Sequence, residues 1–208
     1  RAETGRIYIM NIDHANSHSS FQDKVSMSNL CQEITLPTVP LQHIDGDGEI
    51  ALCILSAINV GTLKDLDELE ELCEVAVRAL DEIIDYQNYP VTAAEISTKA
   101  RRSLGIGYIG LAHYLAKNQV KYGDKGAIKV VHELTEAFQY YLIKASVELA
   151  KEKGKCEYFD RTKYAKGELP IDHYKKDLDE VCSVKMKKNW DKLRKEIAEF
   201  GMRNSTLS

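Results

Sequence analysis

The 208-residue chain has no hydrophobic run long enough to cross a membrane. Its longest nearly apolar stretch, residues 51–61, is well short of the roughly 20 residues that a membrane-spanning helix requires. The N-terminus shows no basic-then-apolar secretory pattern. A basic surface is missing as well, because 28 Lys and Arg stand against 32 Asp and Glu and no basic stripe is interleaved with aromatic residues. These absences predict a cytoplasmic protein with no membrane contact and no direct DNA binding.

A regular cysteine framework is also lacking. The five cysteines are an odd number at irregular spacing, which argues against the disulfide scaffold of a small secreted protein. They are Cys31, Cys53, Cys73, Cys156 and Cys182. Reduced thiols, with one or two special members, are the expected state. The chain begins at Arg1 rather than Met, so we expect it to be a piece of something longer.

Strand and loop patterns fill the first sixty residues. Extended segments are predicted over residues 6–12, 32–36 and 49–55. A polar loop over 14–20 and a turn over 45–48 separate them. No helical period appears in this part of the chain.

Helical periodicity begins after residue 65. Apolar residues recur at spacings of three and four from Leu69 to Ile84, which predicts an amphipathic helix that ends before Pro90. A strand is predicted over 104–109, followed by a helix that runs through residue 117. A longer helix is predicted over 125–153, with Gly154 as its C-terminal cap. Two further helices are predicted over 171–181 and 188–200. The pattern is that of a mixed α/β chain in which helices dominate.

Residues 105–110 match the glycine pattern G-x-G-x-x-G of dinucleotide-binding folds. The basic residues 99–103 precede it, where such a fold needs an apolar strand. Close backbone packing at a strand-to-helix turn is therefore the preferred interpretation.

Two patterns resemble metal-binding sites but lack the ligands that such sites require. Residues 45–50 resemble the centre of a calcium loop, but His43 and Ile54 occupy the first and last ligand positions. His14 and His18 are spaced for one helical face, yet the surrounding sequence is a poor helix former without a Cys or carboxylate partner. We expect a surface loop there and no metal in this chain.

The segment SNLCQEI (28–34) sets an amide, a thiol and a carboxyl group at every second position. In an extended segment Asn29, Cys31 and Glu33 would share one face, with α-carbons about 7 Å apart pair by pair. A sugar ring fits that gap. The alternation predicts a catalytic layout in which a hydrogen-bonding amide, a reactive sulfur and a proton acceptor address one small substrate.

The other cysteines have simpler interpretations. Cys73 lies on the apolar face of its predicted helix and is expected to be a small core residue. Cys156 and Cys182 are expected to be inert thiols near helix ends. Cys53 lies in an apolar strand, and taken alone it too would be a core residue.

Six segments in order resemble the large catalytic subunit of class I aerobic ribonucleotide reductase. They are SNLCQEI (28–34), EIALCILSAINVG (49–61), LDELEELCEVAVRALD (66–81), RRSLGIGYIGLAHYLAK (101–117), YAKGELPIDHYKKDLD (164–179) and GMRNSTLS (201–208). The resemblance implies an α/β fold, part of a ten-stranded barrel with a finger loop through its centre. By this resemblance the chain is a helix-rich fragment of a single catalytic barrel domain, with the finger loop at about 20–36 and the helical part at about 62–208.

The resemblance also implies a role for each site residue. Cys31 matches the finger-tip cysteine that becomes a thiyl radical and removes the C3′ hydrogen of the ribose. Glu33 matches the general base on the 3′-hydroxyl, and Asn29 matches a residue that hydrogen-bonds the substrate. Cys53 matches one member of the redox-active dithiol pair, whose partner lies upstream of this fragment. Leu55 matches a residue that lines the ribose pocket.

The implied activity is reduction of ribonucleoside diphosphates to deoxyribonucleoside diphosphates for DNA synthesis. The resemblance implies a radical from a di-iron tyrosyl small subunit, electrons from thioredoxin or glutaredoxin, ATP and deoxynucleotide effectors, and a homodimer of large subunits, in a bacterial cell or encoded by a phage. This fragment alone is expected to be inactive. Two alternatives stay open: a non-catalytic helical scaffold, and a simple dithiol oxidoreductase that uses Cys31 and Cys53 as its own pair.

Overall fold

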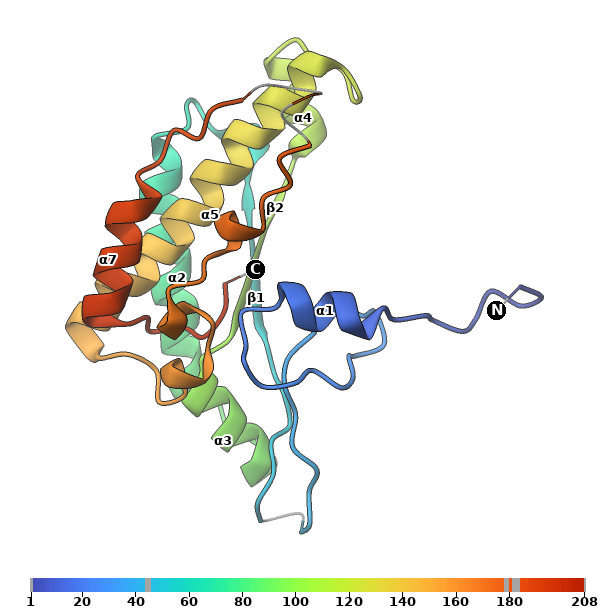
Figure 1. The fold of residues 1–208 in the computed structure, drawn as a ribbon, viewed down its shortest axis with the longest axis vertical. Coiled ribbons are helices and arrows are strands. Elements are labelled where there is room, and N and C mark those ends of the chain that lie inside the picture. Colours follow the sequence, from blue (N-terminus) through green and yellow to red (C-terminus); the bar gives the residue numbers. More distant parts are fainter. Residues whose placement is uncertain (1, 44–45, 178–179, 181–183, 208) are drawn as a thin grey trace.

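The computed structural model describes residues 2–43, 46–177, 180 and 184–207. Helices stack along one side of a narrow pair of strands, and the N-terminal segment extends away from them (Figure 1). Within the described residues, no helix is both long and apolar enough to span a membrane.

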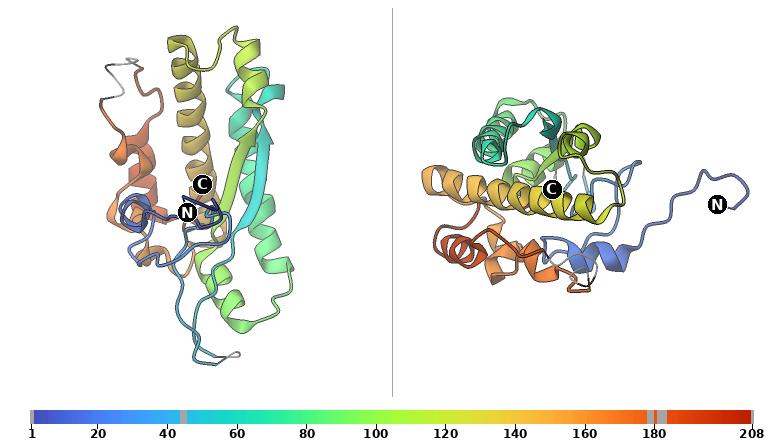
Figure 2. Two further views of the ribbon diagram at one scale, coloured as in Figure 1. Left: turned by 90° about the vertical axis from the view of Figure 1, so that its right-hand side faces the viewer. Right: turned by 90° about the horizontal axis from the view of Figure 1, so that it is seen from above.

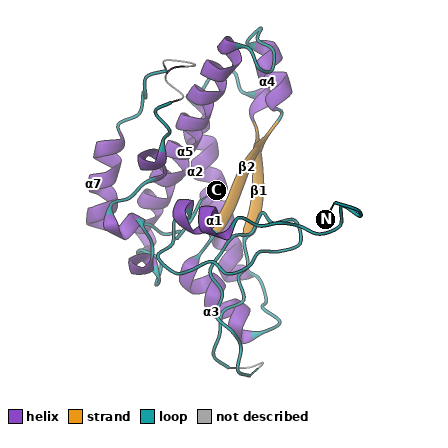
Figure 3. Ribbon diagram, turned by 45° about the vertical axis from the view of Figure 1, so that its right-hand side comes forward, coloured by secondary structure: helices purple, strands orange, loops and turns teal. Residues whose placement is uncertain are grey.

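Two parallel strands form the spine of the fold. β1 (Ile54–Asn59) pairs with β2 (Leu104–Ile109) in a register that sets Ile54 opposite Leu104. Figure 3 shows the two strands side by side, with long loops on one side of them. Leu104 also forms a parallel bridge with Leu207, so the C-terminal segment lies along β2 as a further strand would. This arrangement is the beginning of a parallel sheet with crossover connections.

Helices make that crossover and cover it. α2 (Glu68–Tyr86) and α3 (Thr92–Arg101) connect the two strands, and α4 (Leu111–Lys117) follows β2. Viewed from above, α5 (Lys125–Lys153) lies between α2 and α7 (Trp190–Phe200) (Figure 2). Short 3-10 turns complete the described elements: η1 (Val60–Thr62), η2 (Phe159–Arg161), η3 (Tyr164–Lys166) and η4 (Pro170–His173).

The predicted long elements are confirmed. α2 buries Leu69, Cys73, Val77, Leu80 and Ile84, whose spacings of four, four, three and four place them on one face. The helix over 125–153 has the expected bounds and ends at Gly154, whose φ of +84° suits a residue without a side chain. β2 spans the residues predicted for it, and α7 begins two residues later than expected.

The strand predicted over 6–12 is wrong. Residues 6–11 have no strand assignment, and α1 (Ile12–His18) begins inside the predicted strand and runs through the predicted polar loop. Asn16 stabilises this short helix, because its side-chain amide donates to the carbonyl oxygens of Ile12 and Val25. The apolar run fits a strand in composition, but strand propensity depends strongly on context and does not by itself fix a strand.

Three other boundaries differ from the predictions. The strand expected over 49–55 is displaced to Ile54–Asn59, because its pairing partner β2 fixes where the ladder can form. Residues 32–36 form no strand. Of the helix predicted over 171–181, residues 171–173 belong to the 3-10 turn η4 and residues 174–177 are not helical, while residues 178–179 and 181–183 lie outside the described residues.

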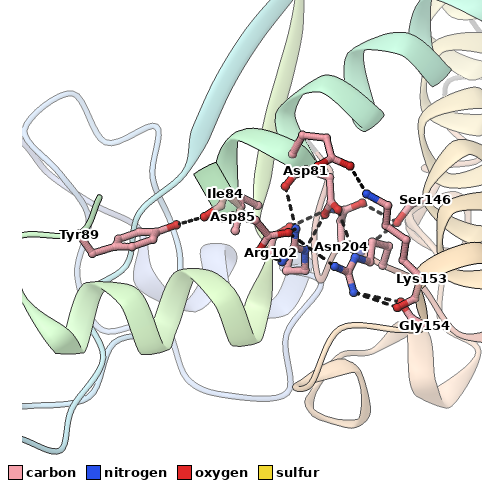
Figure 4. A network of polar contacts seen from close by, with 11 residues as sticks. Asp81, Ile84, Asp85, Tyr89, Arg102, Ser146, Lys153, Gly154 and Asn204 are labelled. Carbon is pink, nitrogen blue, oxygen red and sulfur yellow. Dashed lines mark hydrogen bonds and ion pairs between the residues drawn. The ribbon is translucent and has the colours of Figure 1, made fainter. Parts of the chain in front are cut away.

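A buried charge network ties the end of the chain to the helices (Figure 4). Asp81 of α2 is fully buried and accepts hydrogen bonds from Arg102 Nε at 2.6 Å, Arg203 Nε at 3.2 Å and Asn204 Nδ2 at 3.1 Å. Arg102 also pairs with Asp85, and that hydrogen bond lowers the pKa of the Asp85 carboxyl. The segment after α7 is thereby held against α2 and against Arg102, which lies two residues before β2.

Candidate active site

The cysteine-bearing segment 28–34 forms a turn and not an extended strand. Gln32 adopts a left-handed φ of +64°, and its N–H donates to the carbonyl oxygen of Asn29 at 3.1 Å. Asn29 Oδ1 accepts from the Ile34 N–H at 3.0 Å, and Ser28 Oγ donates to the Ile34 carbonyl oxygen at 2.9 Å. The prediction that alternate side chains share one extended face is therefore wrong. The backbone instead closes into a small hydrogen-bonded tip.

This tip leaves its side chains accessible. Asn29, Cys31 and Glu33 are exposed, and Leu30 retains 78% of its surface. A thiol on such a turn is available to another molecule or segment. The hydrogen bonds within the tip fix its shape. The position of the tip in the molecule depends on the residues at the base of the loop.

Residues next to the tip line a cavity of about 280 Å³. Glu33, Ile34 and Leu36 are among its lining residues, and so is Cys53. Of the five predicted site residues, the cavity thus brings together Glu33 and Cys53. Asn29, Cys31 and Leu55 are not among its lining residues, and Leu55 is 60% exposed on β1.

Cys53 packs over the backbone of the neighbouring strand. A Cβ atom built on Gly105 would meet Cys53 Sγ at 3.1 Å and Leu55 Cδ2 at 2.5 Å. Gly110, at φ +79° just before α4, would likewise place a Cβ 2.4 Å from Asn59 Oδ1. Gly105 and Gly110 therefore serve close backbone packing, as the preferred interpretation predicted, whereas a Cβ atom on Gly107 would meet no atom within 4 Å.

The thiol of Cys53 is kept protonated by its surroundings. Burial, and secondly the negative charge of Glu33, raise its pKa to about 11. The thiolate is the reactive nucleophile of a cysteine, so Cys53 is a poor nucleophile near neutral pH. Glu33 and Cys53, which both line the cavity, are therefore close enough for the carboxylate charge to affect the thiol.

The remaining described cysteines are core residues. Cys73 and Cys156 are buried, and burial raises the pKa of each thiol to about 12. Both predictions of inert thiols are confirmed, while Cys182 lies outside the described residues. No group of three or more His, Cys, Asp or Glu that could hold a metal ion occurs among the described residues.

Comparison with known proteins identifies the fold family. The family model described as "Ribonucleotide reductase, barrel domain" matches residues 1–208. The chain belongs to the ribonucleotide reductase barrel-domain family. The β1–β2 pair with its helical crossover is accordingly part of an α/β barrel, as expected from the sequence.

Relatives of this barrel domain are found in bacteria and phages. It is 61% identical to the ribonucleoside-diphosphate reductase subunit alpha of Haemophilus influenzae, and 55% identical to subunit alpha of reductase 1 of Escherichia coli. It is 46% identical to the subunit alpha of Enterobacteria phage T4. Each match covers the whole chain but only 28% of the relative's length.

Three polar residues of the cavity were not predicted from the sequence. Lys163, Glu168 and His173 line it, together with His18 of α1. His173 Nε2 lies 2.7 Å from Glu168 Oε1, and Lys163 Nζ lies 3.6 Å from the same oxygen. Lys163 and Glu168 flank the 3-10 turn η3, and His173 ends η4, so no periodic pattern in the sequence marks them as members of one site.

The raised pKa of Cys53 predicts how the reactivity of its thiol changes with pH. In the reduced full-length protein, alkylation of Cys53 by iodoacetamide should quicken continuously from pH 7 to about pH 11, because the thiolate fraction grows until the pKa is passed. Glu33→Gln removes the nearby negative charge, lowers that pKa and should quicken alkylation at pH 8. Glu168→Gln, on the same cavity, is the matched control and should change little. A plateau near pH 9 in the unmodified protein would contradict this prediction; peptide mass spectrometry gives the rates.

The contact of Gly105 predicts a cost for its replacement. Gly105→Ala should destabilise the protein by about 1–3 kcal/mol and displace Cys53 and Leu55, because both side chains must move. Gly107→Ala on the same strand is the control, since a Cβ there meets no atom within 4 Å. Thermal unfolding and turnover of the two full-length variants test the difference. Equal effects would remove the packing role of Gly105.

Proposed function

We propose that the full-length protein is the catalytic subunit of a ribonucleoside-diphosphate reductase, which converts ribonucleoside diphosphates to 2′-deoxyribonucleoside diphosphates. The observation that carries the proposal is the cavity that Glu33 and Cys53 both line, with Glu33 two residues from the exposed Cys31. The names of the relatives support the same activity. We further propose that residues 20–36 are the finger loop of the barrel and that 62–208 are its helix-rich part.

Each site residue then has one chemical task. Cys31, as a thiyl radical, takes the C3′ hydrogen atom, and the thiol S–H bond that forms is close in strength to the C–H bond that breaks. Glu33 accepts the proton of the 3′-hydroxyl. Asn29 binds the substrate through its amide nitrogen, because its Oδ1 already accepts from the Ile34 N–H. Leu55 supports the ribose from β1.

The reduction balances with one dithiol. The 2′-hydroxyl leaves as water, Cys53 and a second cysteine supply two electrons and two protons as their thiols form a disulfide, and Cys31 returns the hydrogen atom to C3′. The second cysteine lies in the part of the protein outside this chain. A high thiol pKa suits Cys53, because a protonated sulfur can deliver a proton as the hydroxyl leaves.

Other components belong to the same proposal. A radical-generating small subunit with a di-iron tyrosyl centre supplies the radical, and thioredoxin or glutaredoxin reduces the disulfide. ATP and deoxynucleotide effectors act on a homodimer of complete subunits. The bacterial and phage relatives support the cytoplasm of a bacterial cell as its location.

The two alternatives are less well supported. A simple dithiol oxidoreductase would use Cys31 and Cys53 as its own pair, but Cys31 is not among the residues that line the cavity with Cys53. A non-catalytic scaffold gives no reason for a carboxylate and a thiol to converge on a cavity behind an exposed cysteine.

The proposal is tested by comparing the full-length subunit with the 208-residue chain. With the small subunit and a dithiol reductant, the full-length protein should form deoxyribonucleoside diphosphate. The isolated chain should form none, because the partner of Cys53 and the radical entry path are missing. Product formation by the isolated chain would overturn the proposal that the second cysteine and the radical entry path lie outside these 208 residues.

A further inference from the structure

A buried guanidinium joins the two ends of the cysteine-bearing loop. Arg101, at the end of α3, is 2% exposed. Its Nε donates to Glu49 Oε2 at 2.6 Å, and its Nη2 lies 3.1 Å from Glu49 Oε1 and 3.0 Å from Asp23 Oδ2. Asp23 belongs to the outgoing leg of the loop. Glu49 exchanges backbone hydrogen bonds of 3.0 and 3.1 Å with Val39, which follows the returning leg. One side chain therefore holds both legs.

A second arginine completes the cluster. Arg161 Nε lies 2.8 Å from Asp23 Oδ2, and its Nη1 lies 3.4 Å from Glu49 Oε1. The ring of Tyr158 lies against both guanidinium groups, with its centroid 5.2 Å from Arg101 Cζ and 4.2 Å from Arg161 Cζ. Two cations and two anions balance each other. We call Asp23, Glu49, Arg101 and Arg161 the loop clamp.

The clamp sits where it can set the position of the tip. The tip of the loop is exposed and its hydrogen bonds are local, whereas the base is buried at Phe21, Val25 and Leu36. Cys31 and Glu33 therefore take their location from the base. A small shift at the base moves them as a unit.

The same clamp reaches Cys53. Glu49 stands four residues before Cys53, and the backbone on either side of Cys53 is held near α3. The Ile50 N–H donates to Ala93 O in the first turn of α3 at 3.2 Å, and the Ile54 N–H donates to Ser103 O, two residues beyond the end of α3, at 3.5 Å. Through Glu49, Arg101 is thus linked to the segment that carries Cys53 as well as to the loop.

We propose that Arg101 is a positioning residue that sets the location of Cys31 and Glu33 relative to Cys53. This inference rests on the proposed function. Planar, bidentate hydrogen bonding of a guanidinium fixes direction as well as distance, which a lysine ammonium does not. Since catalysis falls steeply when reacting groups are misplaced by about 1 Å, the variant should bind substrate and react slowly.

The test compares two neighbouring arginines in the full-length enzyme. Arg101→Lys keeps the charge but loses the planar, bidentate hydrogen bonding. It should lower kcat about 10- to 100-fold, with the substrate Kd within about twofold. Arg102→Lys is the matched control: Arg102 is also buried and ion-paired, but with Asp81 and Asp85 of α2. It should lower the melting temperature comparably and leave kcat within about twofold.

Asp23→Asn provides a second route if Arg101→Lys does not fold. It breaks the clamp from a side chain that is 27% exposed and should lower kcat in the same direction. In the double variant the two effects should not multiply in full, because both substitutions disturb the same Arg101–Asp23 contact. A kcat for Arg101→Lys equal to that of Arg102→Lys, or independent effects of the two clamp variants, would overturn the proposal. An unmodified enzyme without reductase activity would instead overturn the proposed function.

Discussion

Cys31→Ser is expected to abolish ribonucleotide reduction in the full-length subunit while leaving substrate binding nearly unchanged. We expect a loss of about 10⁴-fold or more, of the size found when a residue that reacts covalently with substrate is removed. A serine O–H bond is much stronger than a thiol S–H bond, so serine cannot serve as the radical site. Because Cys31 is exposed on a turn, the change removes no core contact and the fold should be retained. Product formation and equilibrium substrate binding, measured on the same protein, give the two results.

A core cysteine is the control for this substitution. Cys73→Ala removes a fully buried thiol from α2 and should lower the free energy of unfolding by about 1 kcal/mol without lowering kcat. Retained turnover in Cys31→Ser would remove Cys31 from its assigned role. Equal losses of turnover in both variants would favour the scaffold interpretation.

Asp81→Ala should cause the largest loss of stability of any single substitution considered for this domain. We expect a decrease of about 3–5 kcal/mol in the free energy of unfolding, because the buried Arg102 and the partly buried Arg203 would lose the carboxylate that they share. Asp81→Asn keeps the size of the side chain and should also be strongly destabilising. Urea unfolding of the full-length variants measures the change.

Asp160→Ala is the matched surface control for the charge network. Asp160 pairs with Lys155, but its side chain is 76% exposed, so its loss should change stability by less than about 0.5 kcal/mol. A decrease below about 1 kcal/mol for Asp81→Ala would show that the network of Figure 4 does not hold the chain end to α2.

The sequence predicted those elements whose burial follows a local period. α2 and α5 have long stretches in which every third or fourth residue faces the core, so their existence and bounds follow from the pattern. α3 was missed because its buried face consists of small and polar residues such as Ala93, Ala94 and Ser97, which give no apolar period. β1 was displaced because pairing with β2, not composition, fixes its ends.

The candidate site shows the same division between local and long-range information. The left-handed Gln32 that closes the tip has no local signal, because a non-glycine residue with positive φ is uncommon. The convergence of Glu33 with Cys53 depends on a loop whose base is fixed by Arg101, far along the sequence. The family resemblance supplied the roles of these residues, and the structure replaced the extended alternation with a turn above a cavity.

The central claim is that the Cys31 sulfur removes a hydrogen atom from C3′ of a ribonucleotide held between the tip and Cys53. It is tested most directly by turnover of a ribonucleoside diphosphate deuterated at C3′, using the full-length subunit with its radical source. We predict slower turnover than with the undeuterated substrate, deuterium retained at C3′ of the product, and no reaction with Cys31→Ser. Equal rates for the two substrates, together with turnover by Cys31→Ser, would contradict the account.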